Sequence, residues 1–230
     1  MFRMMRSFLS TATVTVLVIG VPLALPTTAG AQIHPPRWSA DSILVQFERD
    51  GGGLRLGYVQ AMRVLDRPSP DLATTRDSVL GGLERLALSA TNPPVRTAAA
   101  LTIMSAASED RPRPVPEVVT RLTRIYTQTS DPAVRSVMRG IAWRLADKPG
   151  ALRLMRLIVL AEDSVQARRP LSNFDDASAI REAIENLARF SPEGRATLAD
   201  LHRGKRLRSY VGKERLEHLA RRNFEVERQP

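Results

Sequence analysis

Few of the residue types that bind metals or transfer protons occur at useful spacings in this 230-residue sequence. It contains three histidines and no cysteine, and only one histidine has a carboxylate residue four positions away. That pair, Glu214 and His218, would place two ligands on one face of a helix. The same spacing more often gives a surface ion pair, as expected for Glu217 and Arg221. We therefore expect no metal site.

The motifs of nucleotide-binding and hydrolytic enzymes are also missing. The sequence has no G-x-S-x-G, G-x-x-x-x-G-K-[ST] or G-x-G-x-x-G pattern. The glycines that follow Asp50 fit a helix breaker better than a phosphate-binding loop. The acid pairs Asp175 with Asp176, and Glu182 with Glu185, fit helix N-termini, which attract carboxylates. We expect no cofactor and no enzymatic activity.

A basic segment near the C-terminus is the most distinctive charged feature. Residues 203–222 hold eight basic residues and two acids. On one continuous helix Arg208, Arg215 and Arg222 would recur every seven residues and share one stripe. Such a stripe could bind anionic lipid, a polyanion or an acidic partner. It could also be the solvated outer face of a terminal helix, which is the interpretation we favour.

The elements that must position these residues are helices. Apolar residues recur at spacings of three and four along the chain after residue 38, and no segment sustains the alternation of a half-buried strand. Prolines and glycines separate these runs, as expected where one helix ends and the next begins. Residues 151–163 are apolar around most of a helix, which predicts a buried helix; a strand is the weaker alternative. The expected fold class is all-α.

Two of the predicted helices open with similar residues. "NPPVR" begins at Asn92 and "DPAVR" at Asp131, so Arg96 and Arg135 lie 39 positions apart. Asp131 is placed to accept hydrogen bonds from the first free amides of its helix, and Pro132 suits the first helical position. The residues that follow form one apolar stripe in each helix: Val95, Ala99 and Ile103 in the first, and Val134, Met138, Ile141 and Leu145 in the second.

These two segments resemble the second helix of HEAT repeats, whose typical opening is D-P-x-V-R. The resemblance implies a right-handed α-solenoid of about four helical hairpins over residues 39–190, followed by C-terminal helices over residues 191–230. It also implies that Asp131 caps its helix and that Arg96 and Arg135 bridge to acids of adjacent repeats, with Asn92 as a weaker match to the aspartate. Such hairpins stabilise one another by stacking.

This chain departs from the HEAT pattern where the pattern expects a small residue in the middle of the helix. Met104 and Trp143 stand there, 39 positions apart. We expect them to form a row on the second-helix face, with Arg139 beside Trp143, as the anchor of a protein interface. The alternative is that the C-terminal helices or a first hairpin cover this row.

The N-terminus resembles a secretory signal. Residues 1–31 contain two arginines, an apolar run and an Ala-Gly-Ala ending, which predicts a signal peptide cleaved after Ala31. An uncleaved membrane anchor is the alternative. Residues 32–38 predict an extended leader, and no later apolar run approaches the ~18 residues of a membrane span. Without residues 1–31 the formal charge falls from +10 to +8, because two arginines and no acid are lost.

Together these features predict an exported protein, periplasmic or extracellular, that acts as a protein-binding or scaffold module of the cell envelope. Anion binding through the basic C-terminal helix is the alternative function. HEAT-like units also occur in bilin lyases and in DNA-repair glycosylases. Export lowers the weight of both enzyme classes, because an exported chain meets neither bilin proteins of the cytoplasm nor chromosomal DNA, and no nucleic-acid partner is expected.

Overall fold

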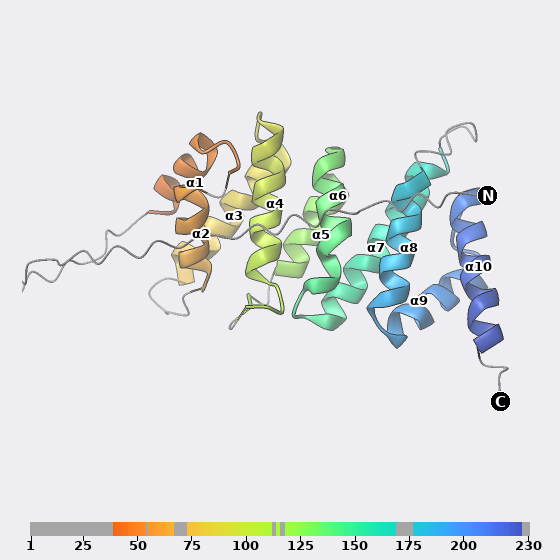
Figure 1. Ribbon diagram of the computed structural model, residues 1–230. Helices are drawn as coiled ribbons and strands as arrows, with labels where there is room; N and C mark the ends of the chain where they lie inside the picture. Colours follow the sequence, from red (N-terminus) through yellow and green to blue (C-terminus); the bar gives the residue numbers. More distant parts are fainter. Residues whose placement is uncertain are drawn as a thin grey trace, which may run out of the picture. The chain divides into compact units, whose positions relative to one another are not determined.

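The computed structural model describes residues 39–53, 55–66, 73–111, 114–115, 118–168 and 177–226. The predicted signal peptide and leader, residues 1–38, lie outside these ranges. The described residues form ten α-helices and one 3₁₀ turn, which confirms the all-α class (Figure 1). In chain order they are α1 (Ala40–Arg49), α2 (Leu56–Asp66), α3 (Ala73–Ser89), α4 (Pro93–Ala106), α5 (Val118–Gln128), α6 (Pro132–Ile141), η2 (Ala142–Arg144), α7 (Lys148–Gln166), α8 (Ser178–Phe190), α9 (Pro192–Arg203) and α10 (Tyr210–Val226).

Local residues determine where several helices begin. Four helices carry proline in the first turn, where its missing amide donor costs no hydrogen bond: α4, α6, α7 and α9. Asp131 caps α6 by accepting hydrogen bonds from the amides of Ala133 and Val134. Asp147 caps α7 and Ser191 caps α9 in the same manner.

The helices pack in sequential pairs. α1 contacts α2, α3 contacts α4, and the same holds for α5 with α6, α7 with α8, and α9 with α10. The first helix of each pair also contacts the first helix of the next pair, and the second helices do likewise (Figure 1). Each pair therefore buries apolar side chains against its neighbouring pairs.

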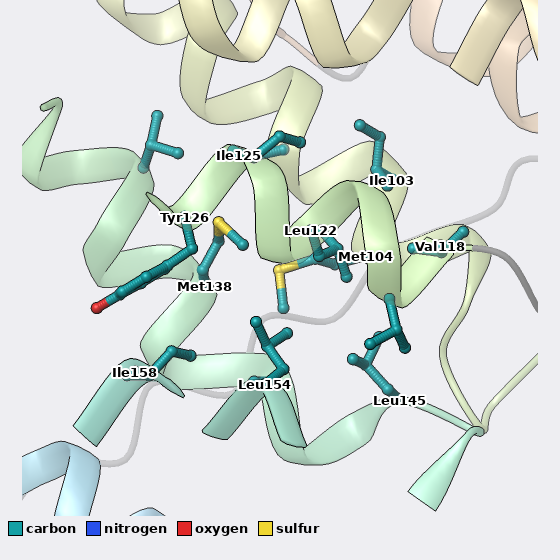
Figure 2. Close-up of a cluster of buried hydrophobic side chains, with 14 of the residues drawn as sticks. Ile103, Met104, Val118, Leu122, Ile125, Tyr126, Met138, Leu145, Leu154 and Ile158 are labelled. Carbon is teal, nitrogen blue, oxygen red and sulfur yellow. The ribbon is translucent and has the colours of Figure 1, made fainter. Parts of the chain in front are cut away.

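The hydrophobic core runs through all of these pairs. Figure 2 shows one part of it, where side chains of α4, α5, α6 and α7 meet. Residues 151–163 lie within α7 and line this core with Leu154 and Ile158. The strand alternative for this segment is therefore wrong. Of the stripe expected along α6, Val134, Met138 and Leu145 are fully buried and Ile141 is partly buried.

The expected continuous basic helix at the C-terminus is wrong. α9 ends at Arg203, the backbone turns through Gly204 and Lys205, and α10 begins only at Tyr210. Lys205 has a positive φ of 49°, an uncommon conformation for a residue with a side chain. Arg208 lies in this connection and not on α10, so it does not share a helical stripe with Arg215.

Candidate functional site

A hollow with a volume of about 990 Å³ lies beside Trp143. We call it the Trp143 groove. Its walls come from the segment that follows α4, from η2, the start of α7, the end of α8 and the start of α9. The lining residues are Glu109, Trp143, Lys148, Pro149, Leu152, Asn186, Arg189, Phe190, Ser191 and Glu193.

Trp143 lies in the groove because α6 ends early. The regular helix stops at Ile141, and residues 142–144 form a 3₁₀ turn. The indole Nε1 donates a hydrogen bond to the carbonyl oxygen of Gly140 at 2.8 Å, and the residue remains 41% exposed. The Arg144 guanidinium lies 5.7 Å from the ring centroid. The indole is therefore fixed in orientation while much of its surface faces solvent.

Backbone hydrogen bonds hold this turn against the segment that follows α4. The amide of Glu109 donates to the carbonyl of Arg144 at 2.8 Å, and the amide of Ala146 donates to the carbonyl of Ala107 at 2.9 Å. Main-chain bonds of this kind do not depend on side-chain rotamers. The wall that carries Trp143 is thus positioned by residues almost 40 positions earlier in the chain.

The rest of the lining combines an aromatic ring with charged groups. Lys148 Nζ lies 5.6 Å from the centroid of the Phe190 ring and forms an ion pair with Glu109. Ser191 caps α9 directly after Phe190, and its hydroxyl accepts from the amide of Gly194 at 3.2 Å. Glu193 lies on the rim, where hydrogen bonds from its own amide and from Ser191 lower its pKa. The groove therefore offers apolar surface between charges of both signs.

Only Trp143 of the three predicted partner-binding residues is available at this groove. Met104 is 2% exposed and lies in the core near Leu122 and Leu154, as Figure 2 shows. The expected surface row of Met104 and Trp143 is therefore wrong. α4 packs against α2, α3, α5 and α6, so it is buried over more than one stripe.

Arg139 is also unavailable to a binding partner, because its side chain is only 11% exposed. Its Nε donates to Glu182 at 2.5 Å, and its Nη1 lies 3.7 Å from Glu162. The carbonyl of Arg139 accepts a hydrogen bond from Asn186 at 3.1 Å. Glu182, in the second turn of α8, thus pairs with Arg139 of α6. The sequence-based expectation that Glu182 marks a helix N-terminus is wrong, because the first turn of α8 contains no acid.

A buried acid of α7, Glu162, is the centre of a polar network inside the core. It accepts hydrogen bonds from the Tyr126 hydroxyl and from Arg135 Nε, the latter at 3.1 Å. The Arg135 guanidinium lies 4.6 Å from the Tyr126 ring centroid. Burial, and then the hydrogen bond to the Glu162 carboxylate, raise the pKa of Tyr126 far above its usual range. The tyrosine therefore stays neutral and acts as a structural donor.

The resemblance implied structural roles for residues at the start of α6 and α4. Arg96 Nε donates to Asp131 Oδ2 at 2.6 Å, across two successive helix pairs. Burial acts to raise the pKa of Asp131, but hydrogen bonds from Arg96 and from the amides of Ala133 and Val134 outweigh it, and the pKa is lowered. Asn92 occupies the cap position of α4, but its side chain makes no capping hydrogen bond.

Similar arginine–acid contacts join other neighbouring helices. Glu84 of α3 accepts from Arg121 of α5 at 2.9 Å and from Arg124 at 2.7 Å. Glu185 of α8 accepts from Arg215 of α10 at 2.7 Å. Several of the arginines thus connect neighbouring helices, where the guanidinium fork suits carboxylate acceptors.

Of the predicted anion-binding residues, Arg208 and Arg215 do not share one helical stripe. Arg215 is paired with Glu185, Arg208 precedes α10, and the side chain of Arg222 lies outside the described residues. Asp175 and Asp176 also lie outside them. In the described ranges no group of three or more His, Asp or Glu side chains is arranged to hold a metal ion. None of the described helices has the length and apolar character needed to cross a membrane.

Sequence reasoning missed Lys148, Leu152 and Phe190 as groove residues. These residues lie on two different helices, and no local spacing relates them to Trp143. It also missed Glu162 as a buried acid. The position of Glu162, directly after the apolar run of α7, could have indicated its burial. No family model, no curated protein and no solved structure matches this chain.

Proposed function

We propose that the protein is an exported α-solenoid of HEAT-like hairpins that binds a protein partner in the cell envelope. The regular contacts between successive helix pairs support the solenoid, because stacked repeats interact with their nearest neighbours. The ion pair between Arg96 and Asp131 supports the HEAT resemblance, since it joins the two matching motifs directly. Export rests on the signal-like composition of residues 1–31.

The observation that carries the binding function is the Trp143 groove. Trp143 is held by a hydrogen bond but is substantially exposed, so its apolar surface is in contact with water in the free protein. A partner that covers this surface would remove that unfavourable hydration. Tryptophan and arginine are enriched at the energetic centres of protein interfaces. Leu152 and Phe190 extend the apolar surface, and the charged rim of Glu109, Lys148 and Arg189 suits a polar border.

The partner that fits this groove is an extended segment of another protein with one large apolar anchor residue. The hollow is wide enough for such a side chain, and volumes of this order are typical of ligand pockets. Because the rim carries both signs of charge, net charge does not select the partner. The partner is selected instead by its anchor residue and by the fit of that residue between Trp143 and Phe190.

Site-specific photo-crosslinking tests this function. A photoreactive residue at Leu152 should crosslink one envelope protein, whereas the same residue at Val45, exposed on α1, should not. With that partner purified, Trp143→Ala should weaken the Kd about tenfold or more. Tyr210→Ala removes another exposed aromatic and should leave the Kd unchanged. Identical crosslinks from both positions, or an unchanged Kd for Trp143→Ala, would refute the groove as the partner site.

A further inference from the structure

A second hollow, of about 380 Å³, lies where α7 faces the connection between α9 and α10. Three arginines line it, Arg156 from α7 and Arg206 and Arg208 from the connection. All three are exposed. Residues 50 positions apart in the sequence thus bring three arginines to one concave surface, which shares no lining residue with the Trp143 groove.

The connection that carries two of these arginines is firmly positioned. The amide of Arg206 donates to the carbonyl of Leu201 at 3.0 Å, after the turn in which Lys205 has a positive φ. Leu207 is buried, while Arg206 and Arg208 on either side of it are exposed. The buried Leu207 side chain thus anchors the connection between the two exposed arginines.

A buried aspartate of α7 fixes the far end of the same connection. Asp163 is 2% exposed and accepts from the amide of Arg208 at 2.7 Å and from the amide of Ser209 at 3.0 Å. The Ser209 hydroxyl also donates to it. Both carboxylate oxygens are therefore directed to the backbone of the connection. The arginines need not lose backbone freedom when a ligand binds, which favours affinity.

The charges around this hollow are unbalanced. The three arginines carry three positive charges and Asp163 carries one negative charge, and no described acid forms an ion pair with any of the three arginines. Arg203 and Arg215, which lie nearby in sequence, do pair with acids. Three like charges around one hollow repel each other, so an anion that binds there relieves that repulsion.

We propose that Arg156, Arg206 and Arg208 form a binding site for a phosphate group. A phosphate carries up to two negative charges and accepts paired hydrogen bonds from the planar guanidinium fork. Ser164 also lines the hollow, and its oxygen accepts from Arg168 at 3.4 Å, so its hydroxyl proton is free to donate to the ligand. This site is independent of the Trp143 groove and of the partner proposed for it.

Such a phosphate group has two sources, a soluble phosphate compound or the headgroup of an anionic phospholipid. Isothermal titration with inorganic phosphate tests the first, and co-sedimentation with phosphatidylglycerol vesicles, compared with phosphatidylcholine vesicles, tests the second. The pocket variant carries Arg156→Gln, Arg206→Gln and Arg208→Gln. A matched variant with Arg49, Arg63 and Arg85 changed to Gln alters the net charge equally on other exposed sites.

The pocket variant should lose phosphate affinity by about tenfold or more, and the matched variant should stay close to the parent. Loss of phosphatidylglycerol binding in the pocket variant alone identifies the lipid headgroup as the source, and phosphate binding without vesicle binding identifies a soluble compound. In the parent protein, phosphate should shift the backbone amide resonances of residues 206–208, which needs no variant. Absence of binding to both probes, or equal losses in the two variants, overturns the site.

Discussion

Replacing Asp131 by alanine removes two interactions that the structure assigns to different carboxylate oxygens. Oδ1 accepts from the amides of Ala133 and Val134, at 2.8 and 3.4 Å, and so caps α6. Oδ2 accepts from Arg96 Nε at 2.6 Å and so ties α6 to α4. A double-mutant cycle of Asp131→Ala with Arg96→Ala separates the tie from the cap, because only the tie involves both residues.

The two contributions differ in size and in physical origin. Loss of an N-cap costs about 0.5–2 kcal/mol. The ion pair lies between the surface and the buried extremes, since the Arg96 and Asp131 side chains are 22% and 9% exposed. Exposed pairs contribute about 0–1 kcal/mol and broken buried pairs cost about 3–5 kcal/mol. We therefore expect a coupling energy of about 1–2 kcal/mol, and a total loss of about 2–3 kcal/mol for Asp131→Ala.

Urea unfolding followed by circular dichroism at pH 7 measures these free energies. Asp131→Asn should keep most of the cap, because asparagine is an equally good N-cap, but should lose the tie, because its amide nitrogen replaces the oxygen that accepts from Arg96. Asp200→Ala removes the exposed pair with Arg203 and should cost less than about 0.5 kcal/mol. A coupling energy below about 0.3 kcal/mol, or equal losses for Asp131→Ala and Asp200→Ala, would refute the proposed tie.

Four further outcomes are expected. The pKa of Asp131 is lowered in the folded state, so its contribution to the free energy of unfolding is present above the unfolded pKa of about 3.9 and is lost as the pH falls through the folded value. In urea titrations at acid pH, Asp131→Asn should therefore lose less stability than the parent. Glu162→Ala should cost about 3–5 kcal/mol in urea, because it leaves buried arginine unpaired, and a cost below about 1 kcal/mol would contradict the network. In a Trp38→Phe background, Trp143 should be quenched by iodide, whereas blue-shifted, unquenched emission would show a covered ring. N-terminal sequencing of exported protein should begin at Gln32, and retention of the apolar leader in the membrane would contradict cleavage.

The helical class and several helix starts follow from the sequence because they depend on local interactions. Proline lacks an amide donor wherever it stands, so Pro132 marks the first turn of α6 without reference to the rest of the fold. Asp131 caps the same helix through amides two and three residues away. The apolar stripe from Val134 to Leu145 depends only on helical periodicity, and its members are buried or partly buried.

Periodicity failed where burial or helix ends depend on distant residues. Met104 lies outside the predicted stripe of α4, yet it is buried because other helices cover that helix on several sides. The segment of residues 203–222 has helical spacing throughout. Asp163, about 45 positions before Arg208, nevertheless accepts hydrogen bonds from the amides of Arg208 and Ser209, and α9 is thereby separated from α10. A single-helix pattern cannot contain either effect.

The two hollows are likewise decided by tertiary structure alone. The Trp143 groove joins residues from Glu109 to Glu193, and the arginine hollow joins Arg156 to Arg206 and Arg208. The sequence by itself determined that Trp143 and the basic segment are unusual for their positions, because a large aromatic residue and a charge excess are visible without a fold. Which neighbours they meet was decided only by packing, since contacts between residues 40 or more positions apart depend on how the helix pairs stack.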